Sequence, residues 1–232
     1  MDSRLYNKAI TCPVCQKAIE ITKVKVNGCK IASRDTDFCI HYEDINPIYY
    51  DVWVCEHCGY AAQSDKFEEV SPRDADIILS KITPRWNKRN FSGERTVEHA
   101  IETFKLALLC LQLRKAKNND IAKVCVRLAW LYRIKKDHKE IEFLQFALKC
   151  YSDIYDRENF PVDKLDEFTC LYMIGELHRR VGDIEEAIQW FSRLISSPEA
   201  RKNPNLVEQA RDQLQFAKEQ LKNVEVRAPN HE

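Results

Sequence analysis

The chain has 232 residues, enough for a small module and a larger one, and its apolar and charged fractions of 44% and 31% are typical of a globular protein. Only 5 residues are glycine, which argues against a sandwich or barrel rich in tight turns, and no apolar run approaches the ~18 residues that span a bilayer. The N-terminus lacks the apolar core of a signal peptide, so we expect a cytoplasmic protein without a membrane partner. In that reducing compartment its 10 cysteines are expected to be metal ligands and buried thiols rather than disulfides.

The formal net charge is zero, but the charges are unevenly distributed along the chain. Residues 71–137 carry a net charge of +8, and the parts on either side are acidic. A basic middle would attract an anion, an acidic peptide or nucleic acid. It would equally pair with the acidic C-terminal third, and this is the interpretation that we favour.

Residues 1–70 are predicted to form a small β-domain of the zinc-ribbon kind. The stretch AIEITKVKV at 18–26 is rich in β-branched residues, and Asn27-Gly28 after it is a strong hairpin signal. The stretch IYYDVWV at 48–54 alternates in polarity and predicts a strand that leads directly into Cys55. Such a strand would orient a metal-binding turn.

Two Cys-x-x-Cys pairs, CPVC at 12–15 and CEHC at 55–58, predict a metal site. Two residues between ligands let one tight turn direct both sulfurs at one ion, and two such turns make a tetrahedral site. Gly59 suits a turn that needs a positive φ, and Gln16 stands at the matching place after the first pair. We predict one structural Zn²⁺ with a closed coordination shell; a rubredoxin-type iron site and disulfide or redox chemistry are the alternatives. The predicted ligands are Cys12, Cys15, Cys55 and Cys58.

The loop at 34–46 mixes acids, an arginine, a cysteine and a histidine with aromatic residues. It is either a binding surface or an ordered loop whose acids accept backbone hydrogen bonds. Cys39 and His41 would serve as replacement metal ligands, as a second site with His57, or as a catalytic pair. The interpretation that we favour is a buried thiol and a surface histidine. The candidate binding residues of this loop are Arg34, Asp35, Asp37, Cys39 and His41.

Residues 71–95 predict a helix over 71–83, capped by Ser71 and started by Pro72, and then a basic linker. From Thr96 the apolar period becomes helical, and short breaks imply antiparallel neighbours. The helical domain is predicted to cover 96–225, followed by a tail at 226–232. Its six helices are expected at about 96–117, 120–136, 138–157, 163–181, 184–197 and 204–223.

The stretch LYMIGELHRRVGDIEEAIQWFSRLI at 171–195 has the spacing of a tetratricopeptide (TPR) hairpin. Gly175 stands where the two helices would cross closely, and Phe191 would fill the gap beside it. Degenerate copies of the pattern occur 46 residues earlier rather than the usual 34. The predicted fold class is therefore α+β, mostly α, with a small zinc-ribbon-like β-domain followed by a TPR-like α-helical hairpin array. An ordinary helix bundle is the alternative.

The strings CPVC, RDTDFC and NPIYYDVWVCEHCGYAA, followed by TPR-like helices, resemble the DUF2225 family of uncharacterised bacterial proteins. The resemblance covers both predicted modules. It implies a bacterial cytosolic protein with a zinc-binding N-terminus at the four cysteines named above, and it places the family's RDTDFC string at residues 34–39. It implies no activity.

The function that we predict is a zinc-stabilised scaffold that binds a protein or peptide, acidic in character, through the groove of its helical array. The alternatives are a nucleic-acid-binding ribbon, which would use Trp86 and Phe91 of the basic linker, and an enzyme at Cys39 and His41. The sequence shows no GxSxG, P-loop, dinucleotide-binding or HExxH motif, so no catalytic residue is predicted. The predicted groove residues are Lys123, Trp130, Arg133, Tyr172, Glu176, Arg179 and Arg180.

Overall fold

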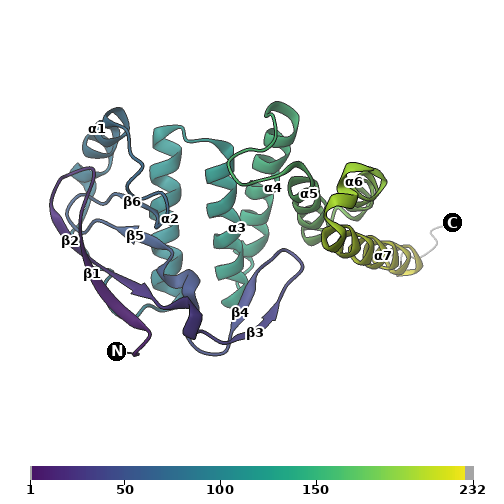
Figure 1. The fold of residues 1–232 in the computed structure, drawn as a ribbon, viewed down its shortest axis with the longest axis horizontal. Coiled ribbons are helices and arrows are strands. Elements are labelled where there is room, and N and C mark those ends of the chain that lie inside the picture. The colour runs from purple at the N-terminus through teal and green to yellow at the C-terminus, as the bar shows by residue number, and fades with distance from the viewer. Residues whose placement is uncertain (1, 228–232) are drawn as a thin grey trace. The chain divides into compact units, whose positions relative to one another are not determined.

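The computed structural model of the chain describes residues 2–227, with side chains to Asn223, and Figure 1 shows its ribbon. Helices dominate it, and three antiparallel strand pairs lie in its N-terminal part, so the predicted class, α+β and mostly α, is confirmed. Packing divides the chain into two units. Unit 1 comprises Met1–Arg34 and Ile40–Glu140, and unit 2 comprises Asp35–Cys39 and Ile141–Glu232. None of the described helices is long and apolar enough to cross a membrane.

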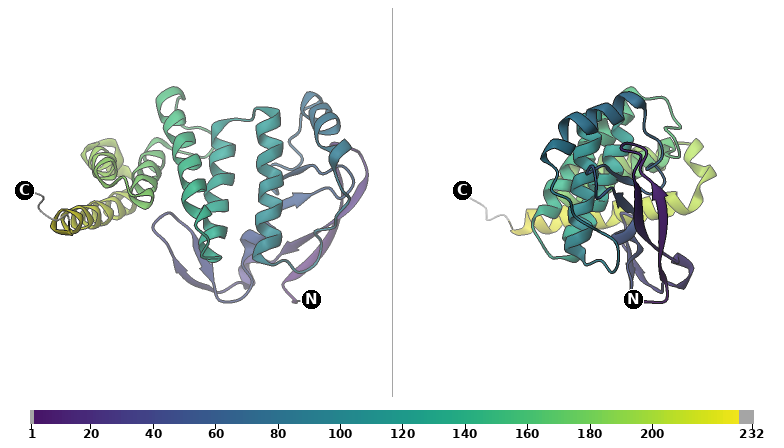
Figure 2. Two further views of the ribbon diagram at one scale, coloured as in Figure 1. Left: turned by 180° about the vertical axis from the view of Figure 1, so that it is seen from behind. Right: turned by 90° about the vertical axis from the view of Figure 1, so that its left-hand side faces the viewer.

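Two hairpins of unit 1 carry the cysteine pairs at their tips. Strand β1 (Leu5–Thr11) pairs with β2 (Ala18–Val24), so the residues between them form a tight turn at 12–17. Strand β5 (Val52–Val54) pairs with β6 (Ala61–Gln63) and presents the second turn in the same way. Figure 2 shows the long β1–β2 pair most clearly in its right-hand view.

A third hairpin belongs to both units. Strand β3 (Ile31–Arg34) pairs with β4 (Ile40–Tyr42) in unit 1, and the five residues at its tip, 35–39, pack in unit 2. The chain therefore passes between the units at both ends of this tip and again at residue 140.

Two local predictions for the β-domain are wrong. Asn27-Gly28 does not form the turn of a hairpin, because Val26–Gly28 is a short 3-10 helix and β2 pairs with the preceding strand, β1. The strand predicted over 48–54 is shortened to its last three residues, since Pro47–Tyr50 forms a 3-10 helix. Asn46 starts that helix by accepting a hydrogen bond from the Ile48 N–H, a capping role that outweighs the alternation of the following residues.

Helices complete unit 1. Helix α1 (Pro72–Lys81) begins at the predicted Ser71 cap, whose hydroxyl accepts from the Asp74 N–H at 3.1 Å. Helix α2 (Val97–Arg114) packs against β5 and β6 and, on another side, against α3 (Asn118–Ile134), which lies beside it in Figure 2. The strands and these helices thus share one core, so the compact unit extends beyond the sequence-based divisions at 70 and 95.

Unit 2 contains the remaining helices. They are α4 (Lys139–Arg157, in this unit from Ile141), α5 (Glu167–Val181), α6 (Ile184–Ser196) and α7 (Pro204–Arg227). Helix α7 runs into the predicted tail at 226–232, and residues 228–232 lie outside the described part. Helices α5 and α6 form a hairpin through Gly182, and α7 packs on both.

The close helix crossing expected in this hairpin is present. A Cβ placed on Gly175 would lie 3.0 Å from ring carbons of Phe191, and the Phe191 side chain is fully buried. Because only a hydrogen fits at residue 175, the two helices approach at the position that the spacing predicted. The assignment of the wider array to the TPR class stays a prediction.

Candidate metal centre

The two cysteine turns have the same backbone geometry. The Gln16 N–H donates to the Cys12 carbonyl and the Gly59 N–H to the Cys55 carbonyl, both at 2.9 Å. Gly59 has the predicted left-handed conformation, with φ 78°, and Gln16 adopts φ 59° although it carries a side chain. The turn therefore requires the left-handed residue at both sites, and the first turn tolerates the strain of Gln16.

The sulfurs of the two turns converge on one point. All four lie within 4.8 Å of one another, with Cys12 Sγ 3.8 Å from Cys58 Sγ and Cys15 Sγ 3.6 Å from Cys55 Sγ. Four sulfurs at about 2.3 Å from a tetrahedral Zn²⁺ would be about 3.8 Å apart, which matches both distances. The donor set thus fits an ion that prefers four thiolates, in a shell closed to water.

Burial and hydrogen bonding make these cysteines suitable ligands. Cys12, Cys55 and Cys58 are almost completely buried, and Cys15 is half-buried. Hydrogen bonds from Cys55 and then Cys58 lower the pKa of the Cys12 thiol to about 4, and the same sharing of protons with Cys12 raises the pKa of Cys58. The cluster therefore holds negative charge readily at Cys12, and a bound cation would ionise the other thiols.

A short segment after α1 covers the second turn. The Trp86 indole N–H donates to the Glu56 carbonyl at 2.7 Å, and the Thr83 hydroxyl donates to the Cys58 carbonyl at 2.9 Å. A Cβ on Gly59 would lie 2.7 Å from Trp86 Cδ2, so the ring rests directly on the glycine. The packing excludes water from the buried side of the cysteine turn.

A buried arginine fixes the start of β5. The Arg95 guanidinium donates to the carbonyls of Phe91 at 2.8 Å, Tyr49 at 2.9 Å and Val52 at 2.8 Å, and the residue is 8% exposed. Burial lowers its pKa to about 10, so it keeps its charge at neutral pH. Three carbonyls on this cation orient the strand that leads into Cys55.

The candidate residues of the 34–46 loop fall into two groups. Arg34 is exposed in β3 and His41 is half-buried in β4, both in unit 1. Asp35, Asp37 and Cys39 belong to the tip in unit 2, where Asp37 and Cys39 are buried. His57 lies at the metal centre instead, with Nε2 3.3 Å from the Ala18 carbonyl oxygen.

The predicted groove residues also divide between the units. Lys123, Trp130 and Arg133 are half-buried on α3 of unit 1, where the Arg133 Nε–H donates to the Glu140 carboxylate at 2.7 Å. The other four lie on α5 of unit 2, where they contact the tip at 35–39. Part of each predicted set thus meets in one cluster, which is formed by the tip and by Tyr172, Glu176, Arg179 and Arg180.

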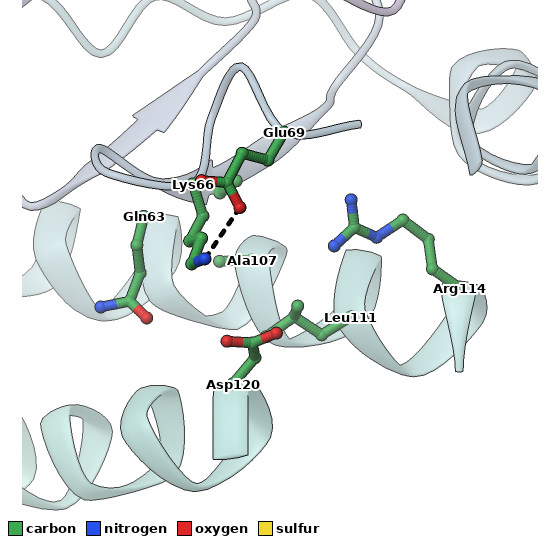
Figure 3. A pocket seen from close by; sticks show the side chains of 8 residues that line it. Gln63, Lys66, Glu69, Ala107, Leu111, Arg114 and Asp120 are labelled. Atoms are coloured by element: carbon green, nitrogen blue, oxygen red, sulfur yellow. Dashed lines mark hydrogen bonds and ion pairs between the residues drawn. The ribbon is translucent and has the colours of Figure 1, made fainter. Parts of the chain in front are cut away.

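Two cavities of unit 1 lie apart from the metal centre. The first, shown in Figure 3, has a volume of about 60 Å³, and its wall includes the Lys66–Glu69 ion pair and the Arg114 and Asp120 side chains. The second, of about 260 Å³, has Tyr49 in its wall together with acidic residues. Sites for small organic ligands usually have roughly 300–1,000 Å³. Both cavities are below that range.

The family follows from a comparison with known proteins. Residues 5–217 match the profile of a family described as "Uncharacterized protein conserved in bacteria (DUF2225)". The chain belongs to this family. An uncharacterised protein of Borreliella burgdorferi (strain ATCC 35210 / DSM 4680 / CIP 102532 / B31) is 25% identical to this DUF2225 member in an alignment of 164 residues that covers 62% of the chain and 59% of the relative. No solved structure matches the chain.

Membership confirms the resemblance seen in the motifs, and the DUF2225 match spans residues of both units. It assigns no activity, because the family and the relative are both described as uncharacterised. Three residues that support the centre carry no motif in the sequence: Thr83, Trp86 and Arg95. They lie in or beside the stretch interpreted as a basic linker, and only their fit against the second turn and β5 shows their role.

Proposed function

We propose that this DUF2225 protein is a zinc-stabilised interaction scaffold, in which a structural Zn²⁺ joins two hairpin tips and the helices bind a protein or peptide partner. The observation that carries the proposal is the convergence of the sulfurs of Cys12, Cys15, Cys55 and Cys58 within 4.8 Å. Four thiolates complete a tetrahedral shell and leave no position for an activated water. A stabilising role is therefore better supported than metal catalysis.

The metal is tested by elemental analysis of protein purified under reducing conditions. We expect one zinc per chain in the wild type and loss of the metal in Cys55→Ser. The matched control is Cys29→Ser, because Cys29 is half-buried and lies outside the cluster; it should keep one zinc. A colourless protein distinguishes zinc from a rubredoxin-type iron site. Wild-type protein without stoichiometric metal would refute the proposal.

The linker aromatics give the nucleic-acid alternative little support. Trp86 packs on Gly59 and donates to Glu56, and Phe91 is only 9% exposed. Stacking on bases needs accessible ring faces, and here Arg89 lies over both rings, 5.3 and 5.8 Å from their centroids. We therefore propose a protein or peptide partner.

The interaction is tested by cross-linked affinity capture with two charge-reversal variants. Lys123→Glu changes a half-buried lysine of the predicted groove, and Lys149→Glu makes the same change at an exposed position on α4. We expect Lys123→Glu to reduce capture of the partner and Lys149→Glu to retain it. Equal capture by both variants and the wild type would exclude the groove.

A further inference from the structure

Four side chains on one face of α5 contact a single short segment of the same unit. Tyr172, Glu176, Arg179 and Arg180 are spaced i, i+4, i+7 and i+8, which places them on adjacent turns of one helix face. The segment is the hairpin tip at residues 35–39, more than a hundred residues away in the sequence. A contiguous segment held by one helix face is the arrangement of a peptide on its receptor.

The helix recognises the backbone and the hydroxyl of Thr36. The Tyr172 hydroxyl donates to the Thr36 carbonyl at 2.8 Å, and the Thr36 hydroxyl donates to the Glu176 carboxylate. Arg180 Nη2 donates to the same hydroxyl oxygen at 3.0 Å. The hydroxyl thus serves as both donor and acceptor, which an alanine at this position would not reproduce.

The helix also recognises an acid and an aromatic ring. Asp37 is completely buried, with Oδ2 3.4 Å from Arg180 Nε, so its charge is compensated by the helix. The ring of Phe38 lies 5.3 Å from the ring of Tyr172, centroid to centroid, and the Phe38 residue is 38% exposed. The recognised features are therefore a hydroxyl, a carboxylate and an aromatic ring in sequence.

The tip forms its own turn. The Asp35 N–H donates to the Cys39 carbonyl at 2.8 Å, and the Phe38 N–H donates to the Asp35 carbonyl at 3.0 Å. Five residues therefore contain both hydrogen bonds that close the turn. A short separate peptide therefore contains every group that forms them.

The receptor side is held in place independently of the tip. Glu176 accepts from Arg179 Nε at 2.9 Å and from Arg180 Nε at 2.6 Å, within α5 itself. The Tyr172 ring packs on Phe191 of α6, with centroids 5.7 Å apart. Because these side chains are positioned by other helical residues, the site should persist when the tip is removed.

We propose that α5 carries a peptide-recognition site for a hydroxyl–acidic–aromatic tripeptide in a turn, and that Thr36-Asp37-Phe38 is its resident ligand. The proposal rests on the proposed function, because it names the class of partner that the scaffold binds. A partner with this chemistry binds by displacing the tip. The tethered tip competes at an effective concentration in the ~mM range, so access to α5 depends on its release.

The experiment moves the resident ligand from the chain to a separate peptide. The receptor is the full-length variant Thr36→Gly/Asp37→Ser/Phe38→Gly, and the probe is a fluorescein-labelled peptide of residues 33–41 with Cys39→Ser. We expect saturable binding by anisotropy, at least about tenfold tighter than to the wild type, whose own tip occupies the site. Arg180→Met added to the variant, or Asp37→Asn in the peptide, should weaken binding about tenfold or more.

A folded, zinc-containing tip variant that binds no peptide would overturn the inference, and so would binding that is unchanged by both controls. Zinc content is measured on the same samples, so failure of the peptide to bind leaves the metal proposal standing, and loss of zinc from the wild type counts only against that proposal. If the triple variant shows no cooperative melt, Phe38→Gly replaces it. The left-handed φ of 69° at this exposed residue suits glycine, and removal of the ring weakens the resident ligand alone.

Discussion

Gly59→Ala tests whether the second cysteine turn is fixed by both its backbone and its cover. Gly59 has φ 78°, and a left-handed conformation disfavours alanine by about 1–2 kcal/mol. The new Cβ would also lie 2.7 and 2.8 Å from Trp86 ring carbons and 3.0 Å from Ile82 Cγ2. Trp86 is held by its hydrogen bond to Glu56, so the ring cannot move away without losing that bond, worth about 1 kcal/mol.

The two effects together predict a loss of roughly 2–3 kcal/mol in the free energy of unfolding. For a chain of this size, that loss lowers the Tm by about 4–12 °C. Gly93→Ala is the matched control, because Gly93 has φ 89° but no atom within 4 Å of an added Cβ. Gly93→Ala should therefore lose only the free energy that the left-handed backbone costs, about 1–2 kcal/mol.

The assay is thermal and urea unfolding of both variants with equimolar zinc, followed by circular dichroism. A Gly59→Ala effect larger than that of Gly93→Ala measures the contribution of the Trp86 cover. Equal losses in the two variants would refute the packing argument and reduce the role of Gly59 to its φ alone.

Three further predictions concern the metal, the tip and a core thiol. Chelation of zinc should lower the free energy of unfolding, measured with urea, by several kcal/mol. Added Zn²⁺ should restore the lost stability and Mg²⁺ should not. An unchanged urea midpoint after chelation would contradict a structural ion. Arg180→Met removes a cation from the buried Asp37 and Glu176 and should lower the free energy of unfolding by about 3–5 kcal/mol. Its control is Arg157→Met, at an exposed ion pair, which should change the free energy of unfolding by less than about 0.5 kcal/mol. Burial raises the pKa of the Cys110 thiol in the folded protein to about 11, above its ordinary value of 9.0. Below pH 9 the thiol is protonated in both states, and as the pH rises from 9 to 11 the unfolded state loses the proton first, so the free energy of unfolding falls. Between pH 8.5 and 10.5, Cys110→Ala should therefore lose about 1–3 kcal/mol less free energy of unfolding than the wild type, as measured by denaturant titration. Equal losses in the two proteins would contradict this assignment.

The parts of the structure that were predictable from the sequence depend on local patterns. The Cys-x-x-Cys spacing indicated the metal turns, the left-handed Gly59 followed from its place after the second pair, and the apolar period located the helices to within a few residues. The errors arose where individual residues outweighed the pattern. Asn46 and Pro47 start a 3-10 helix where the alternation of polarity predicted a strand. Long-range contacts had no sequence signal, so Trp86 in a basic linker gave no indication that it would cover Gly59.

For the same reason, the sequence indicates two separate binding surfaces, the loop at 34–46 and the face of α5. Each looked functional because each concentrates charges and aromatic residues, and in the structure much of that polarity is internal: Asp37 and Glu176 are buried against Arg179 and Arg180. Buried charges are stable only with their partners: Asp37 of the tip depends on Arg180 of α5, whereas Glu176 is paired with Arg179 and Arg180 within the helix itself. The five residues of the tip are anchored at both ends by paired strands of unit 1, which is also the unit that carries the cysteine cluster. Without the tip, α5 would keep its own Glu176–Arg179 and Glu176–Arg180 ion pairs and lose only the resident ligand, so the peptide site belongs to the helix and the hairpin supplies what occupies it.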